Sequence, residues 1–105
     1  MDAFAASPFV ALADPTRRRI VEALATGPLS SGEIAARFPI SAPAVSQHLK
    51  ALKAAGLVRV RSEAQRRIYE IDPEGVEAVA GWADGLRRHW DARLDGLAAA
   101  LKGGT

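Results

Sequence analysis

The stretch SAPAVSQHLKALKAAGLVRVR, residues 41–61, joins two periodicities at Gly56. Before the glycine, apolar residues recur every three or four positions from Val45 to Leu52, which is the spacing of one helix face. After the glycine, apolar and basic residues alternate up to Arg61, which is the pattern of a half-buried β-strand. The stretch therefore predicts a helix with one polar face, ended by a glycine, that runs directly into a strand.

A second helix is predicted just before this one, in LSSGEIAARF, residues 29–38. Ser30 followed by Glu33 forms a capping box, in which the two residues cap free N–H groups of the first helical turn. The short segment PIS then leads to Ser41, which is a preferred N-cap residue. Two helices with a short connection are typical of a helix-turn-helix, here over about residues 30–55, with the second helix as the reading helix.

A β-hairpin is predicted after the reading helix. The segment IYEI, residues 68–71, alternates like a strand and follows the first strand after the short polar connection SEAQRR. The two strands form a wing over about residues 57–71, and its tip carries Gln65, Arg66 and Arg67.

Helices are also predicted toward both ends of the chain. A short helix over about residues 3–12 and a helix that opens at Asp14 and ends at Gly27 precede the helix-turn-helix. Asp72 opens a last helix over about residues 73–102, and both aspartates are followed by proline, as at many helix starts. The last helix carries a continuous apolar stripe. The stripe consists of Val76, Val79, Trp82, Ala83, Leu86, Trp90, Leu94, Leu97 and Leu101.

The composition excludes several classes of protein. The chain of 105 residues is 49% hydrophobic and 25% charged, which fits one domain, residues 1–105, and it has no apolar run that spans a membrane. The absence of cysteine excludes disulfides, a thiolate nucleophile and cysteine-ligated metal. The N-terminus lacks the pattern of a secretory signal, so we expect a cytoplasmic protein. Two isolated histidines and no glycine-rich phosphate loop indicate that it is no enzyme.

The basic residues are concentrated in the middle of the chain. Residues 37–67 contain seven Lys and Arg side chains and one acidic residue, Glu63, and so carry a net charge of +6. The segments before and after carry −1 and −3, within a total of +2. Such a block predicts a polyanionic partner. Aromatic residues are not interleaved with the basic cluster to stack on unpaired bases, which favours double-stranded DNA over RNA.

Three segments in this order, ALADPTRRRIVEAL, LSSGEIAARFPISAPAVSQHLKALKAAGLVRVR and RRIYEIDPEG, resemble the ArsR/SmtB family of bacterial winged-helix repressors over about residues 9–75. The resemblance implies a mainly α fold with a two-stranded β-hairpin wing, that is, a dimeric winged helix-turn-helix. It also implies a homodimer that binds operator DNA, usually represses its own operon and builds its interface from the first and last helices. The operator is then expected to be an imperfect palindrome with half-sites about one helical turn apart, or a multiple of that. The alternative is a winged-helix module that binds another protein.

The polar face of the predicted reading helix offers short neutral side chains near its start and lysines further along. At about 100° per residue, Gln47 lies opposite the buried residues, and His48 lies at the edge of the core. Gln47 is the first choice for base readout because a carboxamide pairs in bidentate fashion with adenine, and Ser46 is the second choice. His48 is either a DNA contact or a packing and capping residue. The DNA-binding residues predicted on this helix are Ser41, Ala42, Pro43, Ser46, Gln47, His48, Lys50 and Lys53.

The wing supplies the second group of predicted DNA contacts, Arg61, Arg66 and Arg67. The two arginines of the tip are expected to probe the minor groove or the phosphates, because arginine is attracted to the negative potential of a narrow groove. Arg61 and its neighbour Arg59 either contact phosphates or pair with glutamates across the hairpin. The run RRR, residues 17–19, points in three directions on a helix, and we expect it in solvent or in ion pairs within the chain.

The apolar stripe of the last helix supports a dimer independently of the resemblance. Two tryptophans and four leucines are too many to hide against a core this small, and exposed apolar patches of this kind mark association sites. The glycines of the helix each cost about 0.5 to 1 kcal/mol relative to alanine, so the helix should depend on its partner. The glycines are also compatible with close helix approach. The predicted interface consists of Phe4, Phe9, Trp82, Leu86, Trp90, Leu94 and Leu97.

No metal ion or other cofactor is expected. The arsenical sensors of the family carry a cysteine pair in the first helix of the helix-turn-helix, where this chain has GEIAARF. In the zinc sensors, the last helix supplies Asp and His from one chain and His and Glu from the other, whereas here it contains His89 alone beside aspartates. His89 and Asp91 point away from each other on a helix, so the remaining alternative is a site shared by His89 of two subunits. The sequence names no effector.

Overall fold

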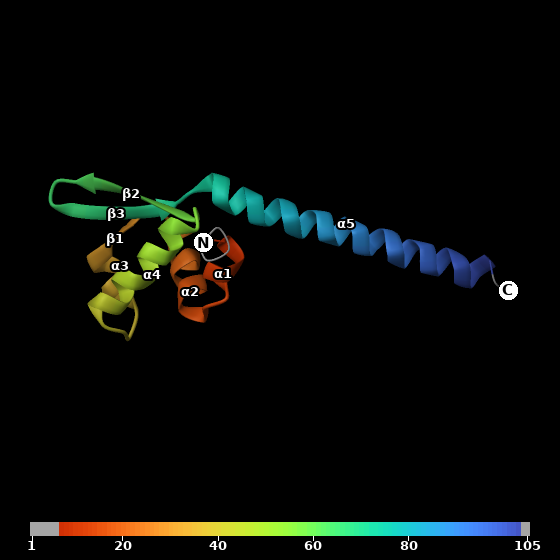
Figure 1. Ribbon diagram of the computed structural model, residues 1–105, viewed down its shortest axis with the longest axis horizontal. Coiled ribbons are helices and arrows are strands. Elements are labelled where there is room, and N and C mark those ends of the chain that lie inside the picture. The colour runs from red at the N-terminus through yellow and green to blue at the C-terminus, as the bar shows by residue number, and fades with distance from the viewer. Residues whose placement is uncertain (1–6, 104–105) are drawn as a thin grey trace.

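The computed structural model describes residues 7–103 and consists of helices with one small antiparallel sheet (Figure 1). In chain order the elements are α1 (Pro8–Leu12), α2 (Pro15–Leu24), β1 (Leu29–Ser30), α3 (Ser31–Arg37), α4 (Ala42–Ala54), β2 (Val58–Glu63), β3 (Arg66–Ile71) and α5 (Pro73–Gly103). The predicted winged helix-turn-helix fold is confirmed, with α3 and α4 as the helix-turn-helix and the β2–β3 hairpin as the wing.

Side-chain caps begin the helices where the sequence predicts them. The Asp14 carboxylate accepts a hydrogen bond from the Arg17 N–H at 3.1 Å, ahead of Pro15 at the first position of α2. In α3, Ser30 Oγ accepts from the Glu33 N–H at 3.1 Å, and the Glu33 carboxylate accepts from the Ser30 N–H at 2.8 Å. These bonds satisfy N–H groups that have no partner inside the helix.

A glycine motif ends α4 and starts the wing. Gly56 has a φ of +77°, its N–H donates to the Lys53 carbonyl at 3.0 Å, and the Leu57 N–H donates to the Leu52 carbonyl at 3.1 Å. This pair of bonds is a Schellman motif, which relies on the left-handed conformation that glycine adopts without a Cβ clash. The chain therefore passes from helix to strand with almost no connecting loop, and β2 begins at Val58.

The sheet has three strands in the order β1-β3-β2, one more than the hairpin predicted from the sequence. β1 pairs antiparallel with β3, with Leu29 opposite Tyr69, and its two residues are too few to show an alternation. β2 and β3 are joined by a turn at Ala64 and Gln65. Gln65 is therefore at the tip as predicted, whereas Arg66 and the following arginine lie in β3.

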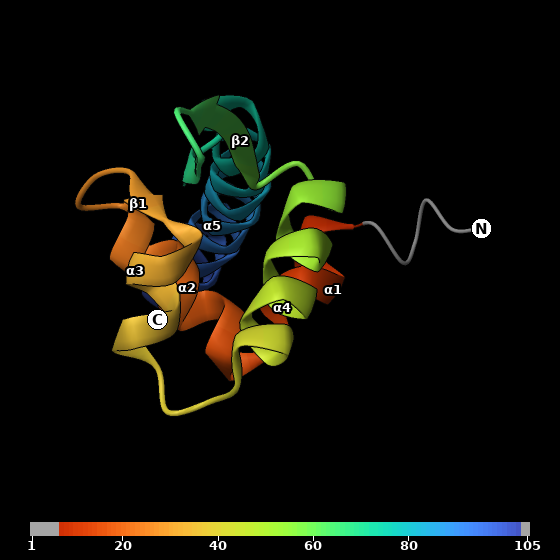
Figure 2. The ribbon, with the colours of Figure 1, turned by 90° about the vertical axis from the view of Figure 1, so that its left-hand side faces the viewer.

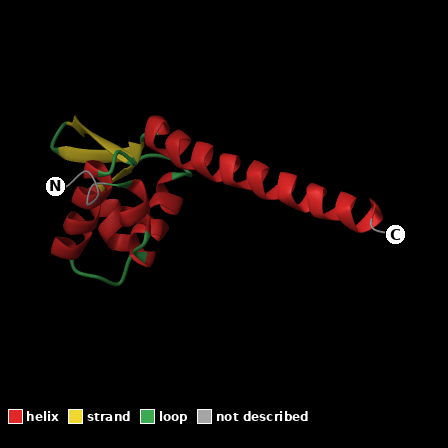
Figure 3. Cartoon of the chain, turned by 45° about the vertical axis from the view of Figure 1, so that its right-hand side comes forward, coloured by secondary structure: helices red, strands yellow, loops and turns green. Residues whose placement is uncertain are grey.

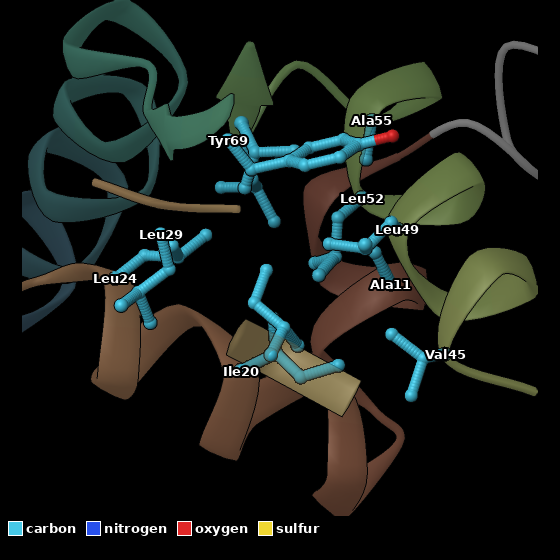
Figure 4. Packing of buried hydrophobic residues seen from close by; sticks show 12 residues of the cluster. Ala11, Ile20, Leu24, Leu29, Val45, Leu49, Leu52, Ala55 and Tyr69 are labelled. Carbon is cyan, nitrogen blue, oxygen red and sulfur yellow. The ribbon is translucent and has the colours of Figure 1, made fainter. Parts of the chain in front are cut away.

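The hydrophobic core lies between the sheet and the helices α2, α3 and α4. Its largest fully buried side chains are Ile20, Ile34, Leu49, Leu52, Leu57 and Val58. Tyr69 reaches from the sheet over the end of α4 near Ala55, and Leu24 and Leu29 lie on the opposite side of the core (Figure 4). Burying one such aliphatic side chain stabilises the fold by about 1.5–3 kcal/mol, so the core fixes which side of α4 faces outward.

α5 projects from this core as one long helix (Figure 1, Figure 3). The radius of gyration is 18.8 Å, whereas a compact chain of this length has about 13 Å. None of the residues of α5 is buried, and most of the apolar stripe is exposed. Among residues 7–103, no helix combines the length and the hydropathy that a membrane crossing requires.

The start of α5 is packed against the end of α4. The Asp72 carboxylate accepts from the Glu74 N–H at 3.1 Å, as expected for a cap. Gly75 lies so close to Gly56 that a Cβ at position 75 would overlap the Gly56 carbonyl. A close approach within the chain therefore requires glycine at this position, whereas a Cβ at Gly81 meets open space.

Candidate nucleic-acid interface

α4 presents to solvent the face predicted to read DNA. Val45, Leu49 and Leu52 are buried in the core, and α4 lies at one side of the molecule (Figure 2). The Ser41 hydroxyl caps the helix by accepting from the Ala44 N–H at 3.2 Å. The predicted residues that are exposed are Ser41, Ala42, Pro43, Ser46, Gln47, Lys50 and Lys53. The helical spacing in the sequence therefore correctly predicts which side of α4 is exposed.

A groove of about 550 Å³ lies between α4, the start of α3 and the wing. Ser46, Lys50 and Lys53 line it from α4, and Arg67 lines it from β3. Three cationic side chains thus meet at one groove, and none of its lining residues is acidic. This concentration of positive charge attracts anions.

Tyr69 positions Arg67 in this groove. The Arg67 guanidinium lies 5.9 Å from the centroid of the Tyr69 ring, within the range of a cation–π interaction. Tyr69 is buried, so the guanidinium rests on a side chain that belongs to the core. Arg67 and Tyr69 are two residues apart on β3, and alternate residues of a strand lie on the same face. This spacing is the signal in the sequence from which their contact is predictable.

Arg66 makes a different contact, because it lies on the opposite face of β3. Its guanidinium donates to the Glu33 carboxylate at 3.1 Å, through the same oxygen that accepts the Ser30 N–H. The hydrogen bond from Ser30 and, to a smaller extent, the charge of Arg66 lower the pKa of Glu33. Both side chains are exposed, so the ion pair is weak and is screened by salt. The two residues are 33 positions apart, and no local sequence pattern connects them.

The remaining wing arginines pair with glutamates, which was one of the two roles expected for them. Arg61 contacts Glu70 at 2.5 Å and Glu63 at 3.5 Å. Arg59 contacts the same Glu70 at 3.5 Å. A DNA contact by Arg61 stays a prediction, and it requires this side chain to exchange its carboxylate partners for phosphate.

His48 is half-buried and faces α2. Its Nδ1 lies 3.5 Å from a terminal nitrogen of Arg17. Arg17 also donates from Nε to the Ala11 carbonyl at 2.7 Å, and Arg18 donates to the Leu12 carbonyl at 2.6 Å. Residues 17–19 were expected in solvent or in ion pairs, and these hydrogen bonds to backbone carbonyls were not predicted. The last carbonyls of a helix lack partners within it, and arginine donors satisfy them here.

An aromatic pair connects α1 with α5. The rings of Phe9 and Trp82 meet edge to face with centroids 5.0 Å apart, and both side chains remain about half exposed. Phe4 lies outside the described residues, and α1 begins at Pro8. The other predicted interface residues, Leu86, Trp90, Leu94 and Leu97, are all exposed along α5.

The described residues do not fit a metal site. Residues 7–103 contain no group of three or more His, Asp or Glu side chains placed to hold a metal ion, and the chain has no cysteine. His89 is exposed on α5, and a site shared between two copies of this residue stays an untested alternative.

Known proteins with similar sequences are transcriptional regulators. Residues 12–61 match the family described as a helix-turn-helix domain. The HTH-type transcriptional regulator Rv2034 of Mycobacterium tuberculosis is 53% identical over 91 residues, which cover 87% of this chain and 82% of that protein. The transcriptional repressor SdpR of Bacillus subtilis is 35% identical over 74 residues, which cover 70% of this chain and 82% of that protein.

A solved structure matches the fold as well. The ArsR-like transcriptional regulator from Rhodococcus sp. RHA1 superimposes with a TM-score of 0.72 at 31% identity, over 85% of this chain and 84% of that chain. This structural match covers more of the chain than the helix-turn-helix segment, residues 12–61. The chain therefore belongs to the ArsR/SmtB family of winged-helix transcriptional regulators.

Proposed function

We propose that this protein is a homodimeric, sequence-specific repressor that binds double-stranded DNA in the cytoplasm, without a metal ion and without catalytic activity. The observation that carries the proposal is the exposed face of α4 around Gln47, together with the cationic groove beside it. Membership of a family of transcriptional regulators supports the same function.

The two parts of this surface have different tasks when α4 lies in the major groove. Gln47 and Ser46 face the base edges, where the carboxamide of Gln47 pairs with adenine. Lys50, Lys53 and Arg67 hold the phosphate strand that enters the groove between α4 and the wing. The helix thus selects the sequence, and the groove supplies most of the salt-dependent affinity.

A dimer presents two copies of α4 to one duplex. The exposed apolar residues of α5 support dimerisation along this helix, because a surface of this kind is unfavourable in water. A two-fold arrangement requires an operator that is an imperfect palindrome, with half-sites about one helical turn apart or a multiple of that.

A gel-shift titration of the protein against DNA from upstream of its own gene tests the proposal. We expect a specific shift that resists nonspecific competitor and is the same in EDTA and in added zinc. Gln47→Ala should weaken binding by about 1–3 kcal/mol and relax the base preference at one symmetric pair of positions.

Two arginine variants provide a matched test of the groove. Arg67→Ala and Arg88→Ala each remove one positive charge, but Arg67 lines the groove and Arg88 is exposed on α5. Arg67→Ala should reduce the dependence of log K on log salt by about 1 per protomer, and Arg88→Ala should leave it unchanged. The docking is wrong if Gln47→Ala and Arg67→Ala bind like wild type. Binding that EDTA abolishes and zinc restores contradicts the metal-independent mechanism.

A further inference from the structure

A contact between α2 and α4 involves neither the cationic groove nor the Gln47 face that we propose to bind DNA. A terminal nitrogen of Arg17, on α2, lies 3.5 Å from Nδ1 of His48, on α4. A guanidinium has only donors and stays protonated in proteins. The contact is therefore a hydrogen bond only when Nδ1 of His48 carries no proton, and the neutral ring then carries its proton on Nε2.

Arg17 is also held by hydrogen bonds to residues other than His48. Its Nε donates to the Ala11 carbonyl at 2.7 Å, so the side chain is tied to the end of α1. Its backbone N–H donates to the Asp14 carboxylate at 3.1 Å, and this bond is the main cause of the lowered pKa of Asp14. The guanidinium therefore meets the histidine from a fixed position rather than from a freely moving side chain.

We infer that Arg17 is a positioning residue that fixes His48 as an Nε2–H donor at the edge of the reading helix. Nε2 is the ring nitrogen farther from the backbone, and among residues 7–103 the hydrogen bond to this ring comes from Arg17. An Nε2–H donor matches acceptors only: a phosphate oxygen, N7 or O6 of guanine, or O4 of thymine. The identity of this ligand rests on the proposed DNA-binding function, whereas the tautomer does not. His48 then has both roles that the sequence left as alternatives, packing through Nδ1 and contacting DNA through Nε2.

The tautomer can be measured on the protein without DNA. Long-range ¹H–¹⁵N correlation spectra distinguish Nε2–H from Nδ1–H rings, and they are recorded at a pH above which the ring signals no longer change. The chain has two histidines, so His89→Asn assigns the signals of His48. We expect one Nε2–H form in wild type and a mixture of tautomers in Arg17→Met, which keeps the apolar stem but loses the donors.

Arg18→Met is the matched control for this spectrum. Arg18 donates to the Leu12 carbonyl at 2.6 Å, so its loss disturbs the end of α1 in a similar way without touching His48. The His48 signals should therefore be those of wild type in Arg18→Met. An Nδ1–H ring in wild type overturns the inference, and so does an unchanged spectrum in Arg17→Met.

Affinity for the operator tests the role of the donor. A glutamine at position 48 places an amide near Nε2, whereas an asparagine places it near Nδ1. His48→Gln should bind within about 3-fold of wild type, and His48→Asn should bind about 3- to 10-fold more weakly, as expected for one lost hydrogen bond. Equal affinities of the two variants overturn the donor role.

A double-mutant cycle tests whether Arg17 acts through His48. Arg17→Met should weaken binding by about 3- to 10-fold in wild type and by less than about 2-fold in the His48→Gln background. Equal effects in both backgrounds overturn the positioning role. A wild-type protein that binds no DNA contradicts the proposed function instead, and the tautomer experiment still decides the Arg17–His48 contact.

Discussion

Replacing Trp90 by glutamate tests the role of α5 in assembly. Trp90 belongs to the apolar stripe of α5 and is 56% exposed. A tryptophan has up to about 250 Å² to bury, so about 140 Å² is free to contact a partner. At about 25 cal/mol per Å², this area corresponds to about 3.5 kcal/mol. A symmetric dimer contains the residue twice, which gives about 7 kcal/mol as an upper bound.

Association has its own costs, so only part of this free energy appears in the affinity. If half of the 7 kcal/mol, about 3.5 kcal/mol, contributes to the affinity, then the substitution that removes it raises the dissociation constant of the dimer about 300-fold. The glutamates add to this effect, because an unpaired carboxylate in an apolar interface loses its hydration. We therefore expect Trp90→Glu to be monomeric at micromolar concentrations at which wild type is a dimer.

Sedimentation velocity over a series of concentrations measures this difference. Ala92→Glu is the matched control, because it adds the same charge two residues along α5, on the exposed side away from the stripe. It should sediment like wild type. Thermal unfolding should show that the winged-helix core stays folded in all three proteins, since Trp90 is outside it. The helical circular-dichroism signal should be lower in monomeric Trp90→Glu than in the two dimers, because α5 has lost the partner on which it depends. The reasoning is refuted if Trp90→Glu dimerises like wild type, or if wild type itself is a monomer.

Three further perturbations test the packing and the caps. Gly75→Ala should lower the free energy of unfolding by about 1–3 kcal/mol, because the added Cβ overlaps the Gly56 carbonyl; an unchanged urea midpoint contradicts this packing. Ala64 has a φ of 56° in the wing turn, so Ala64→Gly should raise the stability by about 0.5 kcal/mol, and a lower thermal midpoint contradicts the assignment of strain. The pKa of Glu33 is lowered on folding, so its contribution is complete above the ordinary glutamate pKa and is lost as the pH falls through the folded value. Glu33→Gln, which keeps an acceptor for the cap, should therefore lose less thermal stability than wild type between about pH 7 and pH 3; equal losses contradict the linkage.

The sequence predicts most of the helices and the wing because their signals are local. A cap at Asp14, a capping box at Ser30 and a glycine stop at Gly56 each act within a few residues, and the structure confirms all three. The face of α4 is predictable for the same reason, since the buried positions alone decide where Gln47 points. The DNA contacts themselves stay predictions.

The parts that the sequence does not predict depend on contacts between distant segments. The ion pair of Arg66 with Glu33 and the contact of Arg17 with His48 join residues 33 and 31 positions apart, and each residue alone fits several environments. The strand β1 is too short for a period to be recognised. These contacts give Arg66 and His48 partners that the sequence does not predict.

The Schellman motif at Gly56 joins α4 to the wing without a flexible loop. Buried Ala55 and Leu57 flank the glycine, and the start of α5 packs against its carbonyl. The spacing between α4 and the wing is therefore set by packing within the chain. In the proposed complex, the duplex supplies the bending or groove narrowing that the fit requires. The free energy of that deformation depends on the base steps involved. We therefore expect operator preferences to extend to base pairs that no side chain touches.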